Sequence, residues 1–183
     1  VAICRAVAAA IFGDPDKVEF TPTTGETRFT ALASGEIDLL ARNSTWTFTR
    51  DVDLKLDFVG VNYYDGQGFM VSKDLGVTSA KELDGATVCI QTGTTTELNL
   101  ADFFKSNGIT YQPVPIQTEA EASQQFLSGA CDTYTTDASG LAASRVRLAG
   151  VVGRPADEDF VADDPAGDRH RQVVLAQMQD GRP

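Results

Sequence analysis

Hydrophobic residues in the first part of the chain recur at helix-like and strand-like spacings in turn. Ile3, Val7 and Ile11 share one face of a helix that Gly13 and Pro15 bring to an end. A second helical pattern follows at 29–33. Short apolar or alternating runs predict extended segments at 18–21, 37–41, 57–64 and 68–71, and residues 42–50 have the polar and aromatic composition of a loop.

The middle of the chain repeats one unit, in which a capped helix follows a short strand. Ser79, Thr94 and Thr118 are each followed three residues later by glutamate, the pattern of a capping box. Strands that alternate with helices predict an α/β fold with parallel sheets. The predicted strands are 87–91, 111–116 and 132–136, and a last helix is predicted at 141–148.

One short pattern occurs twice. Residues 34–38 read Ser-Gly-Glu-Ile-Asp and residues 128–132 read Ser-Gly-Ala-Cys-Asp, each between a predicted helix and a predicted strand. The same interval matches Asn43 with Asp137, and both follow the carboxyl end of a strand, where open α/β sheets bind ligands. The repeat predicts two lobes that each present a polar residue at this edge. Because Ser-Gly pairs are common, coincidence is the alternative.

Composition and charge narrow the function classes. With 183 residues, 42% of them hydrophobic and 22% charged, the chain suits one ordinary domain or two small lobes. No apolar run reaches the ~18 residues that a membrane span requires. A net charge of -11 repels phosphate backbones and argues against nucleic-acid binding. The single histidine, His170, leaves little material for histidine-based catalysis.

The three cysteines, Cys4, Cys89 and Cys131, have two interpretations. An odd number in a secreted chain indicates a missing partner, whereas three small buried hydrophobic residues need none. No pair of them has the spacing of metal ligands, and we expect neither a metal nor another cofactor.

Three places in the sequence offer chemistry for a small charged ligand. Residues 92–97 pass from a strand through a glycine into a helix, whose free N–H groups attract an anion. Arg50 suits a carboxylate, which a guanidinium binds through two parallel hydrogen bonds, and Asp137 suits an ammonium group. The structural alternatives are an ordinary helix cap, a surface arginine and an N-cap aspartate. Together the three places fit a free α-amino acid, with two contacts for its carboxylate and one for its ammonium group.

Several long motifs resemble the periplasmic amino-acid-binding proteins that serve ABC transporters, in particular the general L-amino-acid-binding subgroup. They occur in order and cover nearly all of residues 1–149. The motifs are CRAVAAAIFGDP at 4–15, RFTALASGEIDLLARNSTWTFTRD at 28–51, NYYDGQGFMV at 62–71, ATVCIQTGTTTELNLADFF at 86–104 and SGACDTYTTDASGLAASR at 128–145.

The resemblance implies a two-lobed α/β fold of the periplasmic-binding-protein kind. Each lobe would be a mostly parallel sheet flanked by helices, and the ligand cleft would lie between the lobes. Lobe one would span residues 1–67 and lobe two residues 68–149.

The resemblance also implies roles for residues of lobe one. Arg50 matches the arginine that binds the ligand α-carboxylate, Thr45 a hydroxyl residue that contacts the ligand, and Asn43 a loop position whose backbone does so. Trp46 and Tyr64 match candidate walls of the side-chain pocket, and packing is the alternative for Trp46.

In lobe two the resemblance implies both charged contacts. Thr95, with its neighbours Thr94 and Thr96, matches the helix start that binds the same carboxylate. Asp137 matches the carboxylate that binds the ligand ammonium group.

Both ends of the chain depart from the family pattern. The chain begins without Met, so either a leader has been removed or the chain is a fragment. Because Val1 already lies within a helical pattern, we expect a fragment that lacks the first strand of lobe one. Relatives carry a cysteine on that strand, which would pair with Cys4 and leave Cys89 and Cys131 to form a disulfide. Residues 150–183 match nothing in the pattern, and we expect a tail of loop, disorder or weak helix, from a truncated and frame-shifted reading.

The resemblance implies a monomeric periplasmic protein that is not an enzyme. It would bind free L-amino acids with broad specificity and deliver them to the membrane permease of an ABC transporter. A dehydratase-like enzyme on the same scaffold is one alternative; its nearest acid or base is Glu97, for which the capping pattern favours a structural role. An amino-acid sensor domain of a membrane receptor is another alternative, and an α/β domain with another ligand is the least specific one.

Overall fold

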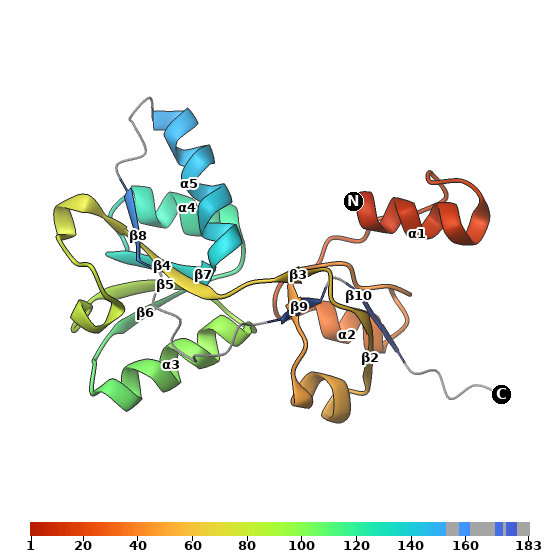
Figure 1. The fold of residues 1–183 in the computed structure, drawn as a ribbon, viewed down its shortest axis with the longest axis horizontal. Coiled ribbons are helices and arrows are strands. Elements are labelled where there is room, and N and C mark those ends of the chain that lie inside the picture. Colours follow the sequence, from red (N-terminus) through yellow and green to blue (C-terminus); the bar gives the residue numbers. More distant parts are fainter. Residues whose placement is uncertain (153–157, 162–170, 174, 179–183) are drawn as a thin grey trace. The chain divides into compact units, whose positions relative to one another are not determined.

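The chain forms two compact units in the computed structural model, which describes residues 1–152, 158–161, 171–173 and 175–178. Unit 1 consists of Val1–Tyr64 with Arg171–Pro183, and unit 2 of Asp65–His170 (Figure 1). The predicted two-lobed α/β organisation is confirmed. The chain passes from unit 1 to unit 2 between Tyr64 and Asp65, close to the boundary predicted after residue 67.

Unit 2 is built on one five-stranded sheet with the order β6-β5-β7-β4-β8. β5 runs parallel to β6 and β7, whereas β4 runs antiparallel to β7 and β8. The sheet is therefore mixed, which corrects the expectation of a mostly parallel one. Hydrophobic alternation carries no information on strand direction, which is fixed here by pairing between distant segments. The strands are β4 (Gln67–Ser72), β5 (Thr87–Gln91), β6 (Gln112–Ile116), β7 (Thr133–Asp137) and β8 (Glu158–Val161).

The helices of unit 2 begin where the capping patterns predict. The side chains of Ser79, Thr94 and Thr118 accept hydrogen bonds from backbone N–H groups of the turns that follow them, which satisfies donors that the helix leaves without a partner. The helical segments are η2 (Lys73–Leu75), η3 (Ala80–Glu82), α3 (Thr95–Asn107), α4 (Glu119–Leu127) and α5 (Ala138–Val152).

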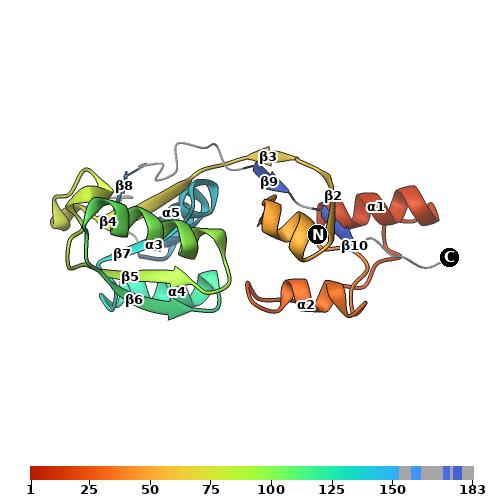
Figure 2. The same cartoon turned by 90° about the horizontal axis from the view of Figure 1, so that it is seen from below.

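Helices cover both faces of this sheet (Figures 1 and 2). On one face, Phe69 of β4 packs with Leu100 and Phe104 of α3 in a buried cluster. On the other face, Met70 of β4 packs with residues of α4 and α5, among them Leu141. Neighbouring residues of β4 thus point to opposite faces, and each face buries its own apolar core.

Unit 1 has shorter strands, and its described strand pairs are all antiparallel. β9 pairs with β1 and β3, and β10 pairs with β2. The core contains Leu32, Leu40, Leu56 and Phe58. The elements are α1 (Ala2–Phe12), α2 (Arg28–Ala33), β1 (Ser44–Thr45), the π-helical turn η1 (Thr49–Asp53), β2 (Leu56–Gly60), β3 (Tyr63–Tyr64), β9 (Arg171–Val173) and β10 (Leu175–Met178).

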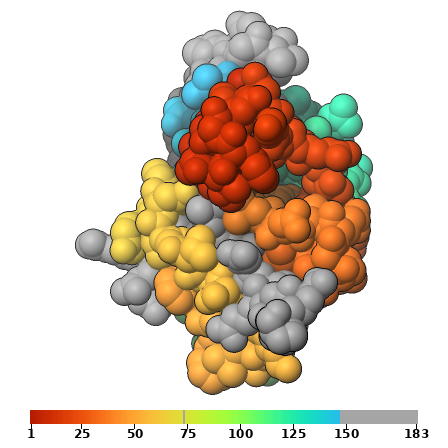
Figure 3. Space-filling model, turned by 90° about the vertical axis from the view of Figure 1, so that its right-hand side faces the viewer, coloured from red at the N-terminus to blue at the C-terminus, as the bar shows by residue number. Residues whose placement is uncertain are grey.

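Helix α1 ends at Gly13 as predicted, because this residue takes the left-handed conformation with φ 70°. Only Ala8 of α1 is buried. In the space-filling view the red amino-terminal part of the chain, which contains α1, forms a rounded bulge that faces the viewer (Figure 3).

Two predicted strands are missing, and three strands are present that the sequence did not predict. Residues 18–21 form no strand, and 37–41 contain only an isolated bridge at Leu40. Conversely, β8, β9 and β10 lie in the region expected to lack strands, because β4, β1, β3 and β2 supply backbone partners for them. A strand is a paired structure, and its partner is invisible in a local pattern. Residues 153–157, 162–170, 174 and 179–183 of the expected tail lie outside the described residues.

A disulfide joins Cys89 on β5 to Cys131, two residues before β7, with their Cα atoms 5.6 Å apart. This prediction is confirmed, whereas Cys4 is a free cysteine in unit 1. The bridge links parallel neighbours of the sheet within unit 2.

Two aspartate–threonine pairs join segments of unit 2 that are distant in sequence. Asp132 accepts hydrogen bonds from the backbone N–H and the hydroxyl of Thr87, at 2.7 and 2.6 Å, and these bonds hold the pKa of its carboxyl below the usual value. Asp84 accepts the same two bonds from Thr110, both at 2.8 Å, with the same lowering of its pKa.

Among the helices that the structure describes, none combines the length and the hydropathy that a membrane span would require.

Loss of the disulfide is expected to destabilise unit 2. Chain entropy predicts a decrease of about 3–4 kcal/mol in the free energy of unfolding for a loop of this size. Urea unfolding of the oxidised protein, the reduced protein and the Cys89→Ala/Cys131→Ala variant measures it. The reduced protein and the variant should unfold at the same urea concentration. Equal unfolding midpoints for the oxidised and the reduced protein would contradict the prediction.

Replacement of Asp132 is expected to make stability less dependent on pH in acid. The folded pKa is lower than the unfolded one, so the carboxylate stabilises the fold above its ordinary pKa of about 3.9, and this contribution is lost as the pH falls through that value and below. Asp132→Asn should cost about 1 kcal/mol at pH 7, and the difference from the unchanged protein should shrink towards pH 3. Thermal unfolding across this range tests it, with Asp102→Asn on α3 as the charge control; a constant difference would refute it.

Candidate functional site

The residues predicted to bind charge in unit 2 lie at one edge of its sheet. β5 and β7 are parallel neighbours, so their carboxyl ends face the same way. β5 leads at this edge into the start of α3 at Thr94–Thr96, and β7 ends there at Asp137. The structure therefore brings together two predicted features that are separated by some forty residues of sequence.

Side chains form hydrogen bonds that cap the amino end of α3. The Thr94 hydroxyl accepts from the Glu97 backbone N–H at 3.2 Å and lies 2.9 Å from the Thr96 hydroxyl. The Glu97 carboxylate in turn accepts from the Gly93 N–H at 2.9 Å, so the acid–base candidate of the dehydratase alternative takes part in capping. Thr96 is buried and Thr95 is half-buried. The dipole and the first N–H groups of this 13-residue helix favour a negative charge here.

Asp137 is the last residue of β7 and directly precedes α5. It is half-buried, and it pairs in register with Gln67, the first residue of β4. The next residue, Ala138, donates its backbone N–H to the carbonyl of Gly66 at 2.8 Å. The backbone around this carboxylate is thus fixed from the side of β4.

In unit 1, Arg50 is not a surface arginine, because only 7% of it is exposed. Its guanidinium donates to the carbonyl oxygen of Thr45 at 3.0 Å and lies 4.8 Å from the ring centre of Phe29. The backbone N–H of Arg50 donates to the Thr47 hydroxyl at 3.2 Å. These contacts orient a planar cation next to a buried threonine.

The other predicted residues of unit 1 lie on both sides of this arginine along the chain. Trp46 is 40% exposed, stacks on Phe58 with ring centres 5.4 Å apart, and donates its indole N–H to Asp51 at 2.7 Å. Trp46 therefore packs against Phe58 and is still partly accessible to solvent. Tyr64 is mostly exposed on β3.

Asn43 is half-buried and precedes β1. The predicted equivalence with Asp137 is only partial, because Asp137 ends its strand whereas no strand leads to Asn43.

The sequence analysis missed Arg28, a second buried arginine, of which 2% is exposed. Its guanidinium donates to the carbonyl of Asn43 at 2.7 Å and to the Ser44 hydroxyl at 3.2 Å, and it also lies over the ring of Phe29, at 4.7 Å. It holds the loop that precedes β1. The sequence did contain a signal for this role of Arg28. A cation at the first position of a helix is unfavourable with respect to the helix dipole, so its presence there indicates that the side chain makes other contacts.

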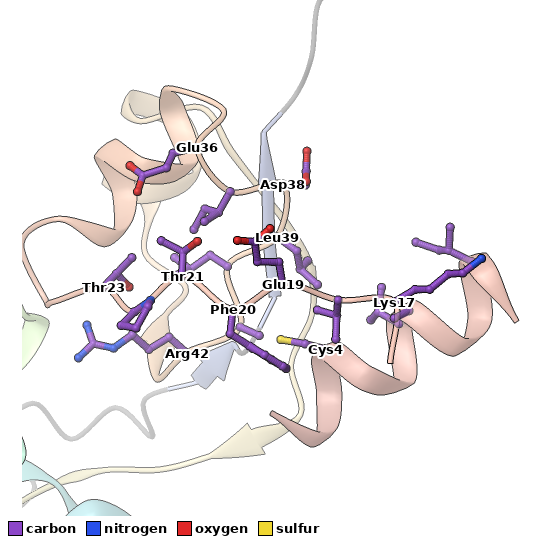
Figure 4. Close-up of a pocket in the computed structure, with 18 of the residues that line it drawn as sticks. Cys4, Lys17, Glu19, Phe20, Thr21, Thr23, Glu36, Asp38, Leu39 and Arg42 are labelled. Carbon is purple, nitrogen blue, oxygen red and sulfur yellow. The ribbon is translucent and has the colours of Figure 1, made fainter. Parts of the chain in front are cut away.

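A cavity of about 880 Å³ in unit 1 has a different lining, which reaches as far as Arg42, the residue before Asn43. It is bounded by α1, residues 17–23 and residues 36–42, with Cys4, Phe20 and Arg42 among the side chains around it (Figure 4). None of the predicted binding residues lines it.

No group of three or more metal-binding side chains occurs among the residues that the structure describes. The chemistry at both places is that of charge pairing and hydrogen bonding: two features suited to a carboxylate and one suited to an ammonium group.

Curated proteins similar to this chain are amino-acid-binding proteins. A glutamate/glutamine/aspartate/asparagine-binding protein of Rhodobacter capsulatus is 66% identical over 167 residues, which are 91% of this chain and 49% of that protein. A general L-amino acid-binding periplasmic protein of Rhizobium johnstonii is 52% identical over 94% of this chain and 50% of its own length. The chain thus spans about half the length of these relatives.

A solved structure supports the same fold. It is described as an ABC transporter/periplasmic binding protein from Brucella ovis with glutathione bound, and it is 48% identical, with a TM-score of 0.85 over 97% of this chain and 54% of that one. The family described as "Bacterial extracellular solute-binding proteins, family 3" matches residues 1–180, which includes the region expected to match nothing. The chain belongs to the bacterial extracellular solute-binding proteins of family 3.

Proposed function

We propose that this protein binds free L-amino acids in the periplasm, with broad specificity, and delivers them to the membrane permease of an ABC transporter. The names of the relatives support this assignment, since both describe proteins that bind several amino acids. In this proposal the protein acts as a monomer and catalyses no reaction.

The observation that carries the proposal is the edge of the unit 2 sheet where the start of α3 and Asp137 occur together. The positive end of a helix dipole attracts an anion, and a carboxylate attracts a cation. A free α-amino acid carries both charges on neighbouring atoms, whatever its side chain is. Recognition of this shared part explains broad specificity.

The ligand carboxylate would bind to the N–H groups and hydroxyls of Thr94–Thr96 and to the guanidinium of Arg50. The ammonium group would bind to Asp137. Thr45 and the backbone of Asn43 would add polar contacts, and Trp46 and Tyr64 would border the ligand side chain.

The energies are sufficient for tight binding. Each hydrogen bond to a charged group contributes roughly 1.5–3 kcal/mol net. A dissociation constant between micromolar and nanomolar needs about 8–12 kcal/mol. A few such bonds, with the burial of part of the ligand side chain, reach this range.

Loss of either charged partner is expected to abolish most binding. In Arg50→Ala and Asp137→Ala a ligand charge would stay buried without its partner, which costs about 2–5 kcal/mol, or roughly thirty-fold and more in affinity. Thermal shift and titration calorimetry with a panel of L-amino acids measure the loss. A ligand at ~100 times its dissociation constant adds about 2.7 kcal/mol to the stability of the unchanged protein.

Matched controls separate binding from charge and folding. Arg5→Ala removes an exposed arginine that pairs with Asp16 in unit 1, and Asp102→Ala removes an exposed aspartate of α3. Both should bind like the unchanged protein. The methyl ester and the N-acetyl derivative of the best ligand should bind weakly, because each lacks one charge. Affinity within threefold of the unchanged protein in Arg50→Ala or Asp137→Ala would refute the proposed site.

A further inference from the structure

The segment Asp65–Gln67, where the chain enters unit 2, contacts both charge-binding places of that unit. Asp65 precedes β4, and its carboxylate accepts hydrogen bonds from the backbone N–H of Gly66 at 2.9 Å and from the backbone N–H of Ser139 at 3.2 Å. It also accepts from the Ser139 hydroxyl. Asp65 therefore ties the entry of the chain to the first turn of α5, two residues after Asp137.

Gln67 reaches the other place. Its side-chain amide donates to the carbonyl oxygen of Thr96 and to the hydroxyl of Thr135, both at 3.0 Å. Because the carbonyl of Thr96 is only an acceptor, these bonds fix which end of the amide faces α3. The bridge joins the first turn of α3 to β4, on the strand position that pairs with Asp137.

The burial of Gln67 indicates that glutamine is not present at this position to increase the stability of the fold. It is 2% exposed, and its amide oxygen is buried without a hydrogen-bond partner in the part of the chain that the structure describes. A buried polar atom without a partner lowers stability relative to an apolar side chain of similar shape. Such a position is typical of a site where geometry matters more than stability.

The side-chain hydrogen bonds of Gln67 and Asp65 connect the start of α3 and the segment after Asp137 to the same short stretch of chain, and so restrict the distance between the start of α3 and Asp137. We infer that Asp65 and Gln67 are positioning residues that fix this separation, and that they thereby make the site select α-amino acids over β-amino acids. The inference rests on the proposed function, in which these two places bind the carboxylate and the ammonium group. In a β-amino acid one more carbon separates the two charges, so a site of fixed spacing rejects it.

The test compares isomers of the same composition that carry the ammonium group on the α carbon or on the β carbon. L-Glutamate with β-glutamate, and L-alanine with β-alanine, are titrated calorimetrically into the unchanged protein, Gln67→Met and Asp65→Ala. Methionine has nearly the shape of glutamine without its donor, and Asp65→Ala removes the second tie without altering the buried core. The unchanged protein should prefer the α-isomer by about tenfold or more, as for one misplaced methylene in a fitted site. Both variants should lower this preference at least threefold.

A control isolates positioning from general loosening. Thr133→Val removes a buried hydroxyl that donates to the carbonyl of Met70 at 3.0 Å, on the same two strands but further from the edge. It should lower the unfolding temperature and leave the preference unchanged.

The outcomes separate the inference from the function on which it rests. If the unchanged protein binds no amino acid of the panel, the proposed function fails. If it binds them without preference for α-isomers, or if both variants keep the preference within twofold, the inference is overturned while the function stands. An equal decrease in Thr133→Val would also overturn it, because any loosening of the sheet would then have the same effect.

Discussion

The antiparallel pairing of β4 with β7 is the constraint on which the rest of unit 2 depends. It places Gln67 opposite Asp137 and carries the buried clusters on both faces, because alternate residues of β4 point into one or the other. β7 in turn aligns β5, and through β5 the start of α3. A shift of this pairing by one residue would turn each side chain of β4 to the opposite face and disrupt both apolar clusters. The register that builds the core therefore also builds the charged edge.

The main feature of unit 1 is the burial of two positively charged side chains. Arg28 and Arg50 are both buried, both donate to backbone carbonyls, and both lie over the ring of Phe29. Carbonyl dipoles and an aromatic face replace part of the water that a guanidinium loses on burial. Arg28 bonds to Asn43 and Ser44, and the next residue, Thr45, supplies the carbonyl oxygen that accepts from Arg50.

Local signals account for the parts of the fold that the sequence predicts well. The helix starts at Thr94 and Thr118 and the strand at 87–91 follow from caps and alternation that neighbouring residues determine. The direction of β4, the absence of strands at 18–21 and 37–41, and the strands β8, β9 and β10 depend on partners elsewhere in the chain. Among the candidate site residues, the burial of Arg50 and the closeness of Asp137 to α3 needed the structure. The resemblance supplied the disulfide pairing, which three cysteines alone left open.

The two units differ in whether one continuous segment of the chain or two separate segments form them. Unit 2 is one continuous stretch, whereas unit 1 combines residues 1–64 with strands β9 and β10, which arrive after all of unit 2. A chain that emerges amino end first thus holds all the described strands of unit 2 before the partners of β1, β2 and β3 exist. Contacts across so long a separation close slowly. Unit 2 can consequently complete its sheet before unit 1 does, and the edges of β1, β2 and β3 stay open to other chains until β9 and β10 have been synthesised.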